Sequence, residues 1–190
     1  KSLSKLKLNY ELGKKTWFGT GGSTTLFLEV HSKSSLKKII KLLPYNFPIF
    51  IVGAGSNLIV RDGGFKGLTL KLTDEFKNID FNKQNKVLKI GGGLKDHIIS
   101  NFCYKNSIGN FEFLRGIPGT LGGNIKMNAG CFGKTISDDL IKCRILNRKG
   151  EELCLDKRDI NFSYRGSDIP DNSIILDAEF SVKLRSKKHI

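Results

Sequence analysis

The spacing of apolar residues in the first third of the chain predicts a strand, a helix and a second strand. Residues 26–30 form the first strand signal, and apolar positions at i, i+3, i+4 and i+7 over residues 36–43 predict a helix that Ser34 or Ser35 caps. Residues 49–52 then form an uninterrupted apolar run, which is typical of a buried strand. A strand, a helix and a strand in succession predict a β-α-β unit, so the two strands are expected to be parallel.

The pattern changes after residue 72, where short strands separated by turn residues predict an antiparallel sheet. One strand is predicted before this change, at 67–72. After it, strands are predicted at 76–81 and 86–90, a helix over 94–102, a hairpin over 141–155 and a final strand over 174–184. In the final strand, alternate apolar residues from Leu176 to Leu184 are predicted to face inward and the residues between them, such as Asp177, outward. The chain therefore predicts an α+β fold of two lobes, a small β-α-β lobe at residues 1–72 and a lobe with an antiparallel sheet and helices at residues 73–190.

The charge of the chain is strongly positive, with 32 Lys and Arg against 18 Asp and Glu and a net charge of +14. These lysines are scattered, and no basic stretch is interleaved with aromatic residues. A basic RNA-binding module is therefore the least favoured hypothesis, and no nucleic-acid partner is expected. An anionic substrate or cofactor gains equally from a positive field.

The cysteines, Cys103, Cys131, Cys143 and Cys154, form no C-x-x-C pair, and no histidine stands beside them at metal-ligand spacing. This pattern favours reduced thiols in a cytoplasmic protein and argues against a metal site. No apolar run approaches the roughly 18 residues that a membrane span needs, so no membrane association is expected.

A glycine-rich turn, Gly53-Ala-Gly-Ser-Asn-Leu58, follows the buried strand at 49–52. Gly53 and Gly55 allow the backbone to turn sharply and to approach a ligand closely, which a Cβ would hinder. Ser56 and Asn57 can form hydrogen bonds, and successive backbone N–H groups in such a turn make a nest for an anion. A phosphate-bearing cofactor is one hypothesis for this turn, and an ordinary loop between two strands is the other.

Neither common nucleotide-binding motif is complete. The dinucleotide fingerprint G-x-G-x-x-G needs a third glycine, but Leu58 stands in that place after Gly53, and Asp96 stands there after Gly91. A Walker A loop that ends at Gly133-Lys-Thr135 would need a glycine where Asn128 stands. Both standard nucleotide-binding folds are therefore disfavoured.

A second glycine-rich stretch covers residues 116–130. Its glycines permit close approach, Pro118 fixes a turn, and Thr120, Asn124 and Asn128 offer hydrogen bonds. Two such loops from different lobes could grip one long, phosphate-bridged ligand between them. The alternative is that they only connect strands.

Arg165 lies in the turn-prone segment 162–167, between two strand signals. A guanidinium stays protonated and binds carboxylate or phosphate bidentately, so it suits the stabilisation of negative charge that develops in a reaction. A surface arginine in a loop remains the alternative. Arg115, directly before the second glycine stretch, is equally open between a ligand contact and a surface charge.

Together these segments resemble the UDP-N-acetylenolpyruvoylglucosamine reductase family, flavoenzymes of peptidoglycan synthesis with the p-cresol methylhydroxylase-type FAD fold. The motifs that carry the resemblance follow one another in the family's order at 16–22, 53–58, 61–64, 91–93, 113–119, 128–130 and 164–165. The resemblance names the phosphate-bridged ligand as FAD. Some relatives in the wider fold attach the flavin through a histidine near the first glycine loop, but Ser56 and Asn57 stand there, so non-covalent FAD is expected.

The resemblance also implies a set of site residues. The pyrophosphate would lie on the first loop, the flavin along the second, and one further contact would come from the final strand. The implied cofactor-binding residues are Gly53, Ala54, Gly55, Ser56, Asn57, Leu58, Ile117, Pro118, Gly119, Thr120, Gly122, Gly123, Ala129, Gly130 and Ile174, and the implied catalytic residue is Arg165.

The implied reaction is the NADPH-dependent reduction of the enolpyruvyl ether of UDP-N-acetylglucosamine to UDP-N-acetylmuramate, carried out by a monomer. NADPH reduces the flavin, the flavin passes hydride to the vinyl carbon, and Arg165 stabilises the negative charge that builds beside the substrate carboxylate. In the family, the serine that protonates the substrate and an assisting glutamate belong to a C-terminal substrate domain. No Gly-Ser-x-Phe-Lys-Asn-Pro-like segment follows Arg165, so the chain is expected to be catalytically incomplete. The alternative within the same fold is an FAD oxidoreductase acting on small alcohols or sugars.

Overall fold

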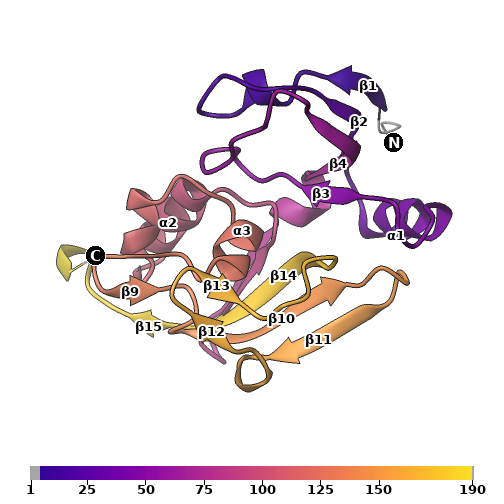
Figure 1. Cartoon of the computed structure of the whole chain (residues 1–190). Coiled ribbons are helices and arrows are strands. Elements are labelled where there is room, and N and C mark those ends of the chain that lie inside the picture. The colour runs from indigo at the N-terminus through magenta and orange to yellow at the C-terminus, as the bar shows by residue number, and fades with distance from the viewer. Residues whose placement is uncertain (1–4, 190) are drawn as a thin grey trace.

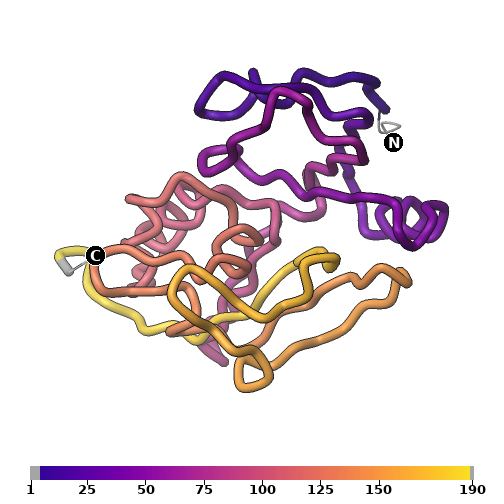
Figure 2. The backbone as a smooth tube through the Cα atoms, in the orientation of Figure 1, coloured from indigo at the N-terminus to yellow at the C-terminus, as the bar shows by residue number. Residues whose placement is uncertain are grey.

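Two β-sheets organise the computed structural model, which describes residues 5–189 (Figure 1). One sheet has four strands in the order β1-β2-β4-β3, and the other has five in the order β11-β10-β14-β6-β5. We call residues 5–72, which carry the first sheet, the first lobe, and residues 73–189 the second lobe. Figure 2 shows the first lobe above the second in this view, with the helix α1 projecting at its side.

The first lobe contains the predicted β-α-β unit. Its elements are β1 (Lys7–Tyr10), η1 (Gly13–Lys15), β2 (Thr24–Val30), α1 (Lys33–Leu42), β3 (Ile49–Ile51) and β4 (Phe65–Leu72). β2 and β3 are parallel, as predicted, and β4 lies between them and runs parallel to both. The predicted helix cap was wrong: α1 begins at Lys33, and the extended backbone of Ser32 places its hydroxyl 3.2 Å from the N–H of Ser35.

The second lobe is built on the antiparallel sheet that the strand spacing predicts. Its helical elements are η2 (Asp74–Lys77), α2 (Asp96–Lys105), η3 (Glu112–Gly116), α3 (Leu121–Lys126), η4 (Lys157–Asp159) and η5 (Lys187–His189). Its strands are β5 (Ile79–Asn82), β6 (Val87–Gly91), β7 (Ile108–Gly109), β8 (Gly130–Cys131), β9 (Lys134–Thr135), β10 (Leu140–Leu146), β11 (Glu152–Asp156), β12 (Phe162–Ser163), β13 (Gly166–Ser167), β14 (Ile174–Ser181) and β15 (Lys183–Leu184). The strand predicted at 76–81 begins later, because the chain first makes the turn η2, which buries Phe76 completely.

The final strand departs from its prediction in two ways. It breaks at Val182, and β15 pairs with β7 instead of continuing in the large sheet, so Leu184 is 54% exposed although it was predicted to face inward. Asp177 was predicted to face outward but is only 6% exposed. Its carboxylate accepts hydrogen bonds from Arg144 on β10 and from Lys33 on α1, so the first lobe covers this face of the sheet.

A shared apolar core joins the lobes. Leu70 of β4 packs in one cluster with Leu146 of β10 and Ile174 of β14, and all three are at most 4% exposed. A second, larger cluster lies within the second lobe and includes Phe180 of β14 and Leu121 of α3. The relative position of the lobes is therefore set by buried apolar contact as well as by ion pairs.

Replacing Asp177 by Asn is expected to lower the free energy of unfolding at pH 7 by about 1–2 kcal/mol. Burial raises the pKa of Asp177, but the bidentate bond from Arg144 and the charges of Arg144 and Lys33 outweigh burial and hold this pKa below its ordinary value. A lowered pKa gives stability that is present above the ordinary pKa of about 4 and is lost as the pH falls through the lowered value. Denaturant unfolding of the wild type and of Asp177→Asn between pH 7 and pH 3 measures their free energies of unfolding. The difference between the two free energies should shrink below about pH 4, and a difference that stays constant with pH would contradict a stabilising role for the ionised Asp177 carboxylate.

Candidate functional site

The first glycine loop leaves β3 and rests on the segment that follows β1. The N–H of Trp17 donates to the carbonyl of Gly55 at 3.0 Å, and a Cβ on Gly55 would lie 3.4 Å from Thr16 Cα. Gly55 has a φ of +71°, a conformation that L side chains adopt at a cost. Among residues 5–189, none of the backbone N–H groups of residues 53–57 donates a hydrogen bond to another protein group, and Leu58 closes the turn at residues 56–57. The loop thus presents a run of unused donors.

The second glycine stretch is held by the Gly91-Gly-Gly93 turn and the start of α2. The N–H of Gly122 donates to the carbonyl of Gly92 at 2.8 Å, and that of Leu121 donates to Leu94 at 3.0 Å. A Cβ on Gly92 would lie 2.3 Å from the carbonyl oxygen of Ile175. The triple glycine therefore serves close packing between β14 and α3.

The two loops, although they come from different lobes, are in direct contact. The hydroxyl of Ser56 donates to the carbonyl of Pro118. A Cβ on Gly53 would lie 2.5 Å from Thr120 Oγ1, so glycine at this position is what allows the approach. The structure thus brings together the two glycine-rich stretches that the sequence analysis suggested could bind one ligand between them.

Arg165 lies at the tip of the β12–β13 hairpin, which is attached to the second glycine stretch. Asn128 Nδ2 donates to the carbonyl of Ser163 at 3.0 Å, and Ser167 Oγ donates to the carbonyl of Lys126 at 2.9 Å. Arg165 is exposed and has a φ of +57°, and its guanidinium carbon lies 5.5 Å from the centre of the exposed Tyr164 ring. In the described part of the chain it pairs with no carboxylate, so its guanidinium is available to a ligand.

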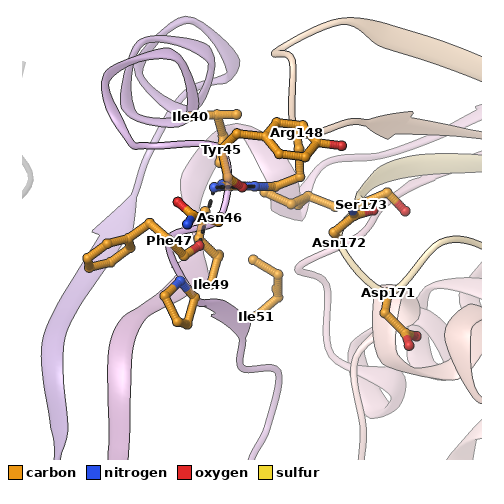
Figure 3. Close-up of a pocket in the computed structure, with 12 residues that line it drawn as sticks. Ile40, Tyr45, Asn46, Phe47, Ile49, Ile51, Arg148, Asp171, Asn172 and Ser173 are labelled. Carbon is orange, nitrogen blue, oxygen red and sulfur yellow. Dashed lines mark hydrogen bonds between the residues drawn. The ribbon is translucent and has the colours of Figure 1, made fainter.

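Ile174 lines a pocket where the lobes meet (Figure 3). Ile49 and Ile51 of β3 contribute apolar side chains to its lining, and Arg148, from the turn after β10, also lines it. Arg148 is 8% exposed. Its guanidinium donates hydrogen bonds of 2.8–3.2 Å to the backbone carbonyls of three residues in the segment after α1, Pro44, Tyr45 and Phe47. It holds the end of α1 against the second lobe. Nothing in the sequence pattern singled it out.

These features fit a phosphate-bridged cofactor. Oxygens of a diphosphate need several hydrogen-bond donors, and the unused N–H groups of residues 53–57 suit that need. Because Gly53 and Gly55 have no Cβ, the loop can lie close against Thr120 and Thr16. The residues present therefore suit the FAD expected from the resemblance.

Two further polar side chains close to these loops were given no site role by sequence reasoning. Asp96, the first residue of α2, is 1% exposed and accepts a hydrogen bond from Asn124 Nδ2 at 2.7 Å. In the sequence, Asp96 stood out only because it occupies the place of the third glycine in a G-x-G-x-x-G motif. Arg115, which the sequence left open, donates to Asn101 Oδ1 at 3.2 Å on the exposed side of α2.

Comparison of the sequence with known protein families shows which family the chain belongs to. The profile of a family described as the FAD binding domain matches residues 24–156. The chain belongs to the FAD-binding domain family. This FAD-binding domain confirms the fold class that the sequence predicted, and FAD is the cofactor named in the family's description.

Curated relatives of the domain confirm the more specific resemblance. UDP-N-acetylenolpyruvoylglucosamine reductase of Rickettsia canadensis (strain McKiel) is 38% identical over 97% of this chain and 62% of the relative. The enzyme of the same name from Rickettsia bellii (strain RML369-C) is 37% identical over 96% of this chain and 60% of the relative. The chain thus spans about 60% of the length of these relatives.

Solved structures agree. The crystal structure of UDP-N-acetylenolpyruvylglucosamine reductase (MurB) from Thermus caldophilus matches 98% of this chain and 64% of that one, with a TM-score of 0.83 and 26% identity. Alkyldihydroxyacetonephosphate synthase matches 85% of this chain with a TM-score of 0.63 and 18% identity, which shows a common fold alone.

Other features of the domain concern metal, thiols and membranes. Over residues 5–189, no group of three or more His, Cys, Asp or Glu side chains is arranged to hold a metal ion, and all four cysteines are free. No helix within that range is long and apolar enough to cross a membrane.

Proposed function

We propose that this chain forms the FAD-binding part of an NADPH-dependent reductase that converts the enolpyruvyl ether of UDP-N-acetylglucosamine to UDP-N-acetylmuramate for peptidoglycan synthesis. The observation that carries the proposal is the contact between the two glycine loops, with Ser56 bonded to Pro118 and Gly53 against Thr120. The named relatives, which this chain matches over nearly its whole length, support the choice of substrate. The four free thiols suit the cytoplasm, where we place the enzyme.

In this proposal the first loop binds the diphosphate of FAD. The N–H groups of residues 53–57 would donate to phosphate oxygens, which would avoid the cost of leaving these donors unpaired beneath a bound cofactor. The second loop, from Ile117 to Gly130, lines the flavin ring, and Ile174 contacts the cofactor from the pocket between the lobes. When bound, FAD supplies hydride-transfer chemistry.

Arg165 is the proposed catalytic residue. Its hairpin is attached to the second glycine stretch through Asn128 and Lys126, and this stretch is the one proposed to line the flavin. A guanidinium binds the substrate carboxylate and stabilises the negative charge that grows next to it in the transition state. The φ of +57° at Arg165 is a strained conformation, and such strain is common at functional sites.

A visible absorption spectrum of the purified protein, taken before and after acid precipitation, tests the proposal. We expect a flavin spectrum that moves completely to the supernatant, because Ser56 and Asn57 provide no side chain for a covalent link. Flavin retained in the pellet would favour a tethered oxidase. A colourless protein that also fails to bind added FAD would contradict the proposed function.

A further inference from the structure

A buried carboxyl group lies directly beneath the second glycine loop. Asp96 is 1% exposed, and its backbone N–H donates to the carbonyl of Gly119 at 3.3 Å. Of its two carboxyl oxygens, Oδ1 accepts the hydrogen bond from Asn124 Nδ2 at 2.7 Å. Oδ2 is buried and has no hydrogen-bond partner among the described residues. An unpaired buried oxygen is costly, and it calls for a physical account.

The unpaired oxygen and the amide oxygen of Asn124 lie on the same side of Gly119. A Cβ on Gly119 would lie 2.7 Å from Asp96 Oδ2 and 2.8 Å from Asn124 Oδ1. Both oxygens therefore border the same place above Gly119. A carboxylic acid and a primary amide can form two hydrogen bonds to each other, one donated by each group. The bond already present is the one that the amide donates.

The surroundings of Asp96 favour the neutral acid. Burial raises its pKa to about 7, against the lowering effect of the hydrogen bonds with Asn124 and the backbone of Gly119. Residues 91–94 and 117–124 contain no titratable side chain. Of the charged residues on η3, which packs against α2, Arg115 bonds to Asn101 and Glu112 acts on Cys103. Lys95 and His97, its neighbours at the start of α2, are exposed to solvent. No buried cation therefore compensates a charge on Asp96.

Asn124 connects the two ends of the segment that is proposed to line the flavin. Its N–H donates to the carbonyl of Thr120 at 3.0 Å, and its own carbonyl accepts from the N–H of Ala129 at 2.8 Å. The backbone of Asn124 thus links Thr120 to Ala129, and its side chain links this segment to Asp96. Asp96 is the group that holds this side chain from below.

We propose that Asp96, as a neutral carboxylic acid paired with the Asn124 amide, is a positioning residue that holds residues 119–129 in the conformation that binds FAD. The inference rests on the proposed function, because it assigns the segment to the cofactor. Ionisation of Asp96 removes the donor on Oδ2 and adds a buried negative charge close to the binding site of an anionic cofactor. FAD affinity should therefore be higher when Asp96 is neutral.

The test is titration of the FAD-free protein with FAD at pH values between 6 and 8. Binding is detected by the quenching of flavin fluorescence. We expect the affinity of the wild type to fall by up to about tenfold as the pH rises, the factor that corresponds to one unit of pKa change on binding. Asp96→Asn keeps an acceptor for Asn124 and carries no titratable group, so it should bind FAD within about threefold of the wild type at pH 6 and show no such fall. Asp96→Ala should weaken binding by about tenfold at pH 6.

The exposed carboxylate of Asp80 on β5 provides the matched control, and Asp80→Ala should behave like the wild type. Thermal unfolding of each FAD-free protein separates a loss of affinity from a loss of fold. The inference fails if Asp96→Ala binds FAD as tightly as the wild type, or if Asp96→Asn keeps the wild-type pH dependence. A wild-type protein that binds no FAD would instead overturn the proposed function, and this inference with it.

Discussion

Replacing Arg165 by alanine is expected to lower kcat by about 100- to 1,000-fold in an enzyme of the relatives' full length that carries this chain, the usual loss when one stabilising group is removed from a developing charge. Arg165 is exposed, and no carboxylate among residues 5–189 competes for its guanidinium. Its removal therefore takes away transition-state stabilisation without opening the core. Steady-state oxidation of NADPH with the enolpyruvyl sugar measures kcat, and the flavin spectrum should be unchanged.

Two variants make this result specific. Arg165→Lys keeps the charge but loses the bidentate fork, so it should recover only part of the activity. Arg158→Ala removes another arginine, 83% exposed, whose partners are the surface carboxylates Asp156 and Asp159, and it should leave kcat within about twofold. If Arg165→Ala retained most of the activity while FAD remained bound, Arg165 would not be the stabilising cation.

The parts of the fold that were predictable from sequence are those fixed by local pattern. The 3.6-residue periodicity over residues 36–43 is satisfied in α1, where Leu36 and Ile40 are buried. The glycine loops were recognisable because glycine and proline restrict or release the backbone in ways that depend on few neighbours. Their placement in separate lobes predicted that the two loops could bind one ligand, but the direct contact between them was not predicted.

The parts that could not be predicted depend on tertiary contacts. Alternation places Asp177 on the outer face of its sheet, but the position of α1 turns that face into an interface where Lys33 and Arg144 neutralise the carboxylate. Arg148 has no local signature, since its partners are backbone carbonyls about a hundred residues away in sequence. Asp96 is similar, because its importance depends on burial against Asn124, which a single sequence does not reveal.

Replacing Gly53 by alanine is expected to weaken FAD binding by about 10- to 100-fold, the factor that corresponds to an overpacking cost of about 1–3 kcal/mol. The new Cβ would lie 2.5 Å from Thr120 Oγ1. The Cβ and Cγ2 atoms of Thr120 lie 3.5 Å from that point, which is an ordinary contact distance, so the clash is with the hydroxyl alone. Either this hydroxyl rotates away or the loops separate, and both changes disturb the contact that the bond from Ser56 to Pro118 also maintains.

Gly63→Ala is the matched control, since a Cβ at Gly63 would meet no atom within 4 Å and its φ is one that alanine adopts. It should bind FAD like the wild type. Equilibrium titration of both FAD-free variants, with circular dichroism to verify the fold, measures the difference. Equal affinities would mean that the contact between Gly53 and Thr120 does not contribute to FAD binding, since only the Gly53 variant disturbs it. A large loss confined to Gly53→Ala would instead locate the diphosphate where the lobes touch, because the control alters the same lobe without altering that contact.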